Sequence, residues 1–150
     1  SIINARSDIF KDSLCILTPT KNTNAKALRK IKRLWSQLGA RVFILNPSNH
    51  DKILSFISHL PHVAAFSLIQ TIPQGYLKFA SSGLKDITRI ALSDSKLWED
   101  IFLSNQKNML EAIELFQKNL SKLKSAIQRR DRKLLSIILK KAKAKRETLI

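Results

Sequence analysis

Residues 95–127 read SKLWEDIFLSNQKNMLEAIELFQKNLSKLKSAI, and apolar residues recur in this stretch every three or four positions. That spacing places apolar side chains along one face of an α-helix. The apolar stripe consists of Leu97, Trp98, Ile101, Phe102, Met109, Ile113, Phe116, Leu120, Leu123 and Ile127. The preceding Ser93, Asp94 and Ser95 offer capping side chains, so we expect one long helix over the whole stretch.

The distribution of glycine and proline extends this interpretation to the second half of the chain. All three glycines and all four prolines fall in residues 1–83, and residues 84–150 contain neither. The second part is therefore predicted to be uninterrupted helix, with a turn near Arg129 and a last apolar helix after it. So few helices cannot cover one another's stripes, which favours a helical dimer.

The beginning of the chain has a different pattern. Residues 14–17 and 42–45 are short apolar runs, and between them lies an apolar helical stripe that Thr23 or Asn24 can cap and Gly39 can end. Strand, helix and strand in this order predict a parallel βαβ unit. Strands this apolar are usually buried on both faces of a larger sheet. We therefore expect residues 1–46 to be the last βαβ piece of a Rossmann-like nucleotide-binding domain whose earlier strands precede Ser1.

Residues 47–150 are predicted to form an all-helical domain, which makes the chain mainly α. Residues 49–60 carry an apolar stripe that Pro61 is expected to interrupt, because proline cannot donate a backbone hydrogen bond and its ring crowds the preceding turn. Residues 63–72 are apolar on nearly every side, as in a core or a subunit interface. Pro73 and Gly75 should end that helix.

The net charge of +16 raises the alternative of a basic helical nucleic-acid-binding module. Residues 1–83 and 84–150 each carry a net charge of +8, and the lysine- and arginine-rich tail has no aromatic residue to stack on bases. Solvated helix faces explain this pattern better, so we expect no nucleic-acid partner. We also expect no membrane partner, because no apolar run approaches ~20 residues. The single cysteine, Cys15, fits a reducing cytoplasm.

The three histidines are candidates for chemistry. His59 and His62 flank Pro61 at a spacing of three, and His50 adjoins Asp51. A helical zinc pair usually has a spacing of four with a carboxylate between, so we predict no metal site. Each histidine could simply cap a helix, but two beside a proline kink suggest a concave site.

A second candidate is the segment GLKDITRIA, residues 83–91. On a helix Asp86 and Arg89 are three apart and can pair, which would orient the guanidinium group. A fixed arginine can bind a carboxylate through two parallel N–H bonds. An ordinary surface ion pair is the plainer interpretation, but the apolar neighbours Ile87, Ile90 and Ala91 favour partial burial. No glycine-rich phosphate-binding loop is present, so nothing in these residues binds a dinucleotide by itself.

Read in order, these segments resemble the prephenate/arogenate dehydrogenase family. The matching stretches are LTPT at 17–20, LW at 34–35, LGA at 38–40, HD at 50–51, SHLPH at 58–62, FASSGL at 79–84, DITRIA at 86–91, SD at 93–94, Trp98, DIF at 100–102 and Asn105. The resemblance implies an N-terminal Rossmann domain, a C-terminal helical dimerisation domain, NAD or NADP as cofactor and a homodimer. It implies oxidative decarboxylation of prephenate to 4-hydroxyphenylpyruvate, or of arogenate to tyrosine.

The resemblance also implies roles for individual residues. Arg89 would bind a substrate carboxylate, and Asp86 would orient Arg89 or belong to the gating network around it. Ser58, His59 and His62 would line the same pocket, with His62 the better candidate for direct contact. Trp98 would reach the pocket mouth, and the role of His50 stays open. The family's catalytic histidine and its dinucleotide loop would precede Ser1, so this fragment alone is expected to be inactive.

Overall fold

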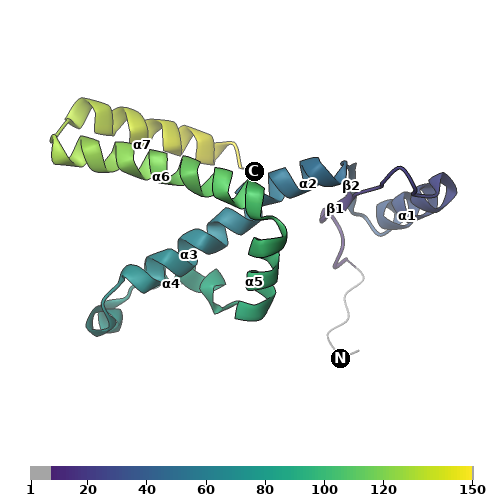
Figure 1. Cartoon of the computed structure of the whole chain (residues 1–150), viewed down its shortest axis with the longest axis horizontal. Helices are drawn as coiled ribbons and strands as arrows, with labels where there is room; N and C mark the ends of the chain where they lie inside the picture. The colour runs from purple at the N-terminus through teal and green to yellow at the C-terminus, as the bar shows by residue number, and fades with distance from the viewer. Residues whose placement is uncertain (1–7, 150) are drawn as a thin grey trace. The chain divides into compact units, whose positions relative to one another are not determined.

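The computed structural model describes residues 8–149, which are mainly helical with one two-stranded parallel sheet (Figure 1). This confirms the predicted fold class. The chain divides into two compact units, Ser1–Pro61 and His62–Ile150, and each is described by itself. Residues 1–7 and 150 lie outside the described residues.

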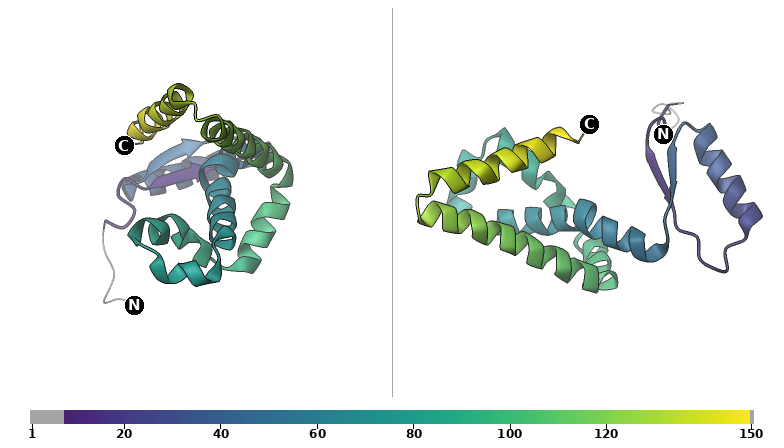
Figure 2. Two further views of the ribbon diagram at one scale, coloured as in Figure 1. Left: turned by 90° about the vertical axis from the view of Figure 1, so that its left-hand side faces the viewer. Right: turned by 90° about the horizontal axis from the view of Figure 1, so that it is seen from above.

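The first unit contains the predicted βαβ motif. Strands β1 (Leu14–Leu17) and β2 (Arg41–Ile44) run parallel, and helix α1 (Ala25–Gln37) connects them. Figure 2 shows α1 alongside the two strands. β2 begins one residue earlier than expected. The side chains of Leu14 and Phe43 remain about half exposed, so the apolar faces of this sheet need further cover.

Local interactions explain where α1 begins and ends. The Asn24 side chain accepts hydrogen bonds from the amides of Lys26 and Ala27, at 2.9 and 3.1 Å, and so caps the first turn. Gly39 follows the helix with a φ of 85°, a conformation that favours glycine. A β-carbon at this position would lie 3.2 Å from the Cα of Lys11. Both predicted helix signals are confirmed.

The interruption expected at Pro61 is wrong, because helix continues through it. Helix α2 (Pro47–Leu54), the π-helix η2 (Ser55–His59) and helix α3 (Leu60–Thr71) follow one another directly. The Leu60 amide donates to the carbonyl of Ser55, five residues earlier. This wider turn accommodates the residue before Pro61 and relieves the crowding that proline causes in regular α geometry.

The helix Pro47–Thr71 is long and apolar enough to cross a membrane by length and composition, with a window of mean hydropathy 1.4. The sequence expectation missed this because it considered the segments on either side of Pro61 separately. The core helix of a soluble protein meets the same criterion. The finding therefore does not assign a membrane span.

The second unit continues with short elements after α3. These are the 3-10 helix η3 (Gln74–Phe79), helix α4 (Ser82–Thr88) and the 3-10 helix η4 (Arg89–Leu92). Helix α5 (Ser95–Ser104) begins after Asp94, whose carboxylate accepts a hydrogen bond from the Leu97 amide at 2.8 Å. The predicted cap is thus confirmed at Asp94.

The single long helix expected after this cap is wrong, since α5 and α6 (Gln106–Gln128) are separate helices. Asn105, with φ −112° and ψ 30°, leaves helical geometry between them. Its side-chain oxygen accepts a hydrogen bond from the Asn108 amide group at 2.7 Å. The Ser104 hydroxyl donates to the carbonyl of Ile101. Such local side-chain bonds compete with the regular helical pattern and explain the break.

Helices α6 and α7 (Arg132–Glu147) form an antiparallel pair (Figure 1). The predicted turn near Arg129 is confirmed, with Arg130 at a φ of 52°. Asp131 then caps α7 by accepting a hydrogen bond from the Leu134 amide at 2.8 Å.

Few large side chains are fully buried in the described residues. The buried apolar residues are Ala40, Ala65, Trp98, Met109, Ala112 and Ala126. By contrast Leu103, Leu120 and Ile127 on α5 and α6 are each about 60% exposed. The helices leave much of their apolar stripes uncovered, which agrees with the expectation that they need a partner.

The first prediction concerns the π-turn. Ser55 is completely buried, and its hydroxyl donates to the carbonyl of Lys52 at 2.7 Å. Ser55→Leu should lower the free energy of unfolding by about 1–3 kcal/mol, because the larger side chain overfills this position. Ser55→Ala, the matched control, loses only the hydroxyl bond and should cost about 1 kcal/mol or less. Urea unfolding measures both, and a leucine no more costly than alanine would contradict the packing at this turn.

Candidate functional site

His62 and Trp98 are brought into direct contact within the second unit. Their rings stack with centroids 3.4 Å apart and an interplanar angle of 21°. His62 lies on α3 and is half-buried, whereas Trp98 lies on α5 and is 8% exposed. Two predicted site residues from distant parts of the sequence therefore form one contact.

Two phenylalanine rings extend this contact into a cluster. Trp98 is tilted against Phe102 with ring centroids 5.4 Å apart, and Phe66 meets Phe102 edge-on at 6.5 Å. Phe66 also lies 6.4 Å from His62. Aromatic pairs in such geometries contribute about 0.5–1.5 kcal/mol each beyond the area they bury. We call these four residues the ring cluster, and it joins α3 to α5.

Ser58 and His59 lie on the π-helix η2 of the first unit. His59 is buried, with 9% of its surface exposed, and Ser58 is half-buried. π-helical turns are rare and frequently occur at functional sites. The sequence analysis singled out both residues but missed Ser55 and the wide turn itself. The available signal was a proline in an apolar run with helical spacing on both sides.

Arg89 and Asp86 differ from expectation. Arg89 is exposed rather than partly buried, and within residues 8–149 it forms no ion pair with Asp86, which is also exposed. α4 ends at Thr88, so Arg89 opens the 3-10 turn η4 and the two residues do not share one regular helix. The neighbouring Ile87 and Leu92 are 64% and 89% exposed and do not cover the guanidinium group. It is accessible to an anion.

His50 pairs with the adjacent Asp51, whose carboxylate lies 2.9 Å from the histidine Nδ1. His50 is half-buried and Asp51 is exposed. Within the part of the chain that the structure describes, no three His, Cys, Asp or Glu side chains gather as possible metal ligands.

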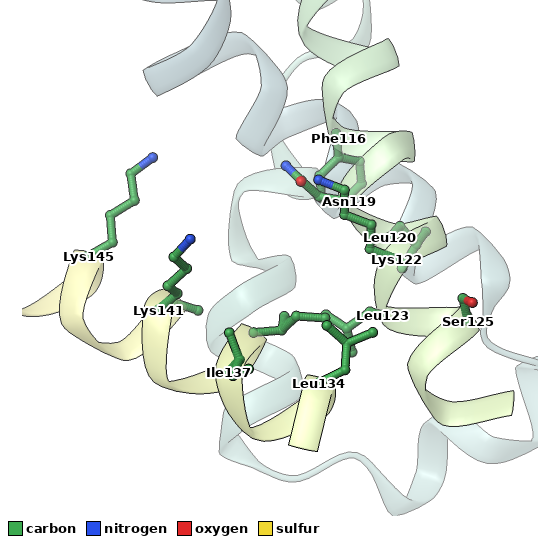
Figure 3. A pocket seen from close by; sticks show the side chains of 12 residues that line it. Phe116, Asn119, Leu120, Lys122, Leu123, Ser125, Leu134, Ile137, Lys141 and Lys145 are labelled. Carbon is green, nitrogen blue, oxygen red and sulfur yellow. The ribbon is translucent and has the colours of Figure 1, made fainter. Parts of the chain in front are cut away.

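A groove of about 830 Å³ runs between α6 and α7 (Figure 3). Its apolar lining comes from both helices and includes Phe116, Leu120, Leu123, Leu134, Ile137 and Ile138. Lys141 and Lys145 of α7 border the groove as well. The paired stripes on these helices were the sequence signal for this surface, although the turn that aligns them is needed to form it.

The described residues thus combine a parallel βαβ unit with a helical unit whose apolar faces are partly uncovered. Comparison with known sequences specifies the family. Residues 46–141 match the prephenate dehydrogenase dimerization domain, and residues 2–44 match the prephenate dehydrogenase nucleotide-binding domain. The chain belongs to the prephenate dehydrogenase family.

Individual relatives agree with this assignment. The cyclohexadienyl dehydrogenase of Zymomonas mobilis is 35% identical over 83% of this chain and 45% of its own length. The prephenate dehydrogenase of Bacillus subtilis is 33% identical over 97% of this chain and 41% of its own length. The chain thus spans less than half the length of these relatives.

A solved structure shows the same fold at higher identity. The prephenate dehydrogenase of A. aeolicus, in complex with hydroxyphenyl propionate and NAD+, is 42% identical with a TM-score of 0.81. The match covers 90% of this chain and 49% of that one.

Proposed function

We propose that the chain is the substrate-binding and dimer-forming part of a prephenate or arogenate dehydrogenase of tyrosine biosynthesis, acting in the cytoplasm. The observation that carries the proposal is the helical domain, which holds His62 on Trp98 and presents an exposed Arg89. The family match over residues 46–141 supports it. We propose a domain boundary between residues 46 and 47, which is supported by the nearby separation of the two family matches, over residues 2–44 and 46–141.

The proposed reaction is an oxidative decarboxylation. A bound nicotinamide would supply the acceptor for the hydride from C4 of the cyclohexadiene ring, and the ring carboxylate would depart as CO2. The electron pair of the broken carbon–carbon bond completes the aromatic ring, and the C4 oxygen keeps its proton as a phenol. Prephenate gives 4-hydroxyphenylpyruvate, and arogenate gives tyrosine.

The residues of this chain would bind and orient the substrate. Both substrates carry carboxylates, and the planar guanidinium group of Arg89 can donate two parallel hydrogen bonds to one of them. His62 would contact the substrate through the edge of its ring, since Trp98 covers one face. Ser58 and His59 would line the substrate pocket, and Asp86, which forms no ion pair with Arg89 within residues 8–149, would belong to the gating network around it.

The nucleotide, NAD or NADP, would be held mainly by residues of the protein outside this chain. The connection from β1 to α1, residues 18–24, contains no glycine, and no G-x-G-x-x-G occurs in the 150 residues. The structure between these two elements therefore does not provide the loop that lets a backbone approach a pyrophosphate closely. We assign no hydride-transfer step to residues of this chain.

We further propose that the α6–α7 groove lies in the interface of a homodimer. The dimerization-domain match extends through α6 into α7 and ends at residue 141. The groove is apolar, and its residue Leu120 is 58% exposed within this chain. A second copy could supply helices with the same apolar stripe, which suits a groove that neither helix fills by itself.

Substrate binding can be tested at Arg89. In the full-length protein that carries this chain, Arg89→Ala should weaken substrate affinity by a factor on the order of 100, because it leaves the bound carboxylate unpaired. Arg89→Lys keeps the charge but loses the two-bond geometry, so its affinity for substrate should lie between that of the unmodified protein and that of Arg89→Ala. Lys85→Ala, which removes an exposed cation from the same α4–η4 segment, is the matched control. Titration calorimetry and steady-state kinetics measure the effect, and an unaltered affinity and kcat in Arg89→Ala would refute the proposed role.

The dimer can be tested at Leu120. Leu120→Glu places a charge in the apolar groove and should shift the protein from dimer to monomer in sedimentation velocity. Lys118→Glu on the same helix lies outside the groove lining and should remain dimeric. Equal association of the two variants would show that the dimer forms elsewhere.

A further inference from the structure

Phe102 contacts Trp98, one of the two rings in the stack of His62 and Trp98. It follows Trp98 by four residues on α5, and Phe66 follows His62 by four residues on α3. Residues four apart lie on the same face of a helix, so each helix contributes one vertical pair of rings. The two pairs interlock, because Phe66 meets Phe102 at an interplanar angle of 90°. Phe102 is thereby held between Phe66 and Trp98.

The stack restricts what the His62 ring can do. A ring lying flat against an indole at 3.4 Å cannot tilt far without losing that contact. Its two nitrogen atoms lie in the ring plane, so they form hydrogen bonds at the edge of the ring and within that plane. The orientation of Trp98 therefore sets the direction in which the imidazole reaches another molecule.

The orientation of the Trp98 indole depends in turn on the side chains that surround it. Trp98 is 8% exposed, and its ring neighbour Phe102 lies on the same helix. Within residues 8–149, the rings that Phe102 contacts are those of Trp98 and Phe66, and not that of His62. A smaller side chain at position 102 would leave space on this side of the indole. Trp98 could then rotate away from the imidazole while the helices stay in place.

We propose that Phe102 is a positioning residue that holds Trp98 against His62 and so fixes the direction of the imidazole edge toward the substrate. The part of this inference that concerns substrate rests on the proposed function. The alternative is that Phe102 only fills the core, in which case its loss would reduce stability without changing His62 in the folded molecules.

The experiment compares Phe102→Leu with Phe102→Tyr in the full-length protein. Leucine removes the ring and keeps an apolar side chain, whereas tyrosine retains the ring and should restore the behaviour of the unmodified protein. Phe102→Met offers a second ring deletion with a flexible side chain that fills gaps, should the leucine variant fold poorly. Phe43→Leu, on the half-exposed strand β2 of the first unit, controls for the loss of a phenylalanine elsewhere.

The first measurement is NMR of the histidine ring protons without ligand. His62 is one of the three histidines in these 150 residues, and the indole stacked on it should shift its ring signals upfield. We expect this displacement to fall by at least half in Phe102→Leu and Phe102→Met. It should persist in Phe102→Tyr and Phe43→Leu. A His62 signal that is unchanged when the ring at 102 is removed would overturn the inference.

The second measurement separates KM from kcat for prephenate and arogenate. We expect KM to rise about tenfold in the ring-deletion variants, as when one hydrogen bond to a bound group is misdirected, with kcat unchanged. If the His62 signal lost its upfield shift in the ring-deletion variants while KM stayed unchanged, the positioning role would be refuted. If the unmodified protein bound neither compound, the proposed function would fail, while the NMR comparison would still decide whether Phe102 holds the stack.

Discussion

The hydrogen bond from the Leu60 amide to the Ser55 carbonyl is the local constraint on which the arrangement around Pro61 depends. It spans five residues and widens one helical turn just before the proline. Without that turn, the proline ring would crowd the preceding carbonyl and the helix would kink or end. With it, Ser58 and His59 remain in helical backbone in η2, and His62 remains in helical backbone in α3.

The extent of burial differs between neighbouring parts of the chain. The wide turn contains the buried Ser55 and His59, whereas α3 has a single buried residue, Ala65, despite being apolar on nearly every side. The second unit repeats this contrast, because its ring cluster is well packed and its long helices leave leucine and isoleucine side chains exposed. A helical domain whose candidate binding residues His62 and Trp98 pack within the chain, while apolar helix faces stay exposed, is suited to association through those faces. This division of roles is consistent with a family whose domain is described as one for dimerization.

Much of the fold could be predicted because its signals are local. The cap at Asn24, the glycine at 39 and the turn after α6 each act within a few residues, and all three occur as expected. The helix through Pro61 could not be predicted from the effect of proline on regular α geometry, since one inserted residue removes the conflict. The break at Asn105 was hidden by an apolar stripe that continues on both sides of it.

The candidate site was predictable only in part. Residue types and family resemblance selected His62, Trp98 and Arg89, but the stack of the first two joins segments far apart in sequence and needed the folded chain. The same is true of Phe102, which lies in the apolar stripe and in one of the stretches that match the family but has no role predicted from the sequence. The expected pairing of Asp86 with Arg89 does not occur within residues 8–149, where both side chains are exposed.

The central claim is that this chain contributes to a dehydrogenase acting on prephenate or arogenate. The most direct measurement incubates the full-length protein with each compound and either NAD or NADP, and quantifies reduced nucleotide, CO2 and aromatic product together. We predict equal molar amounts of all three for at least one pairing, with 4-hydroxyphenylpyruvate from prephenate or tyrosine from arogenate. Folded protein that forms no reduced nucleotide and no aromatic product in any of the four pairings would contradict the account.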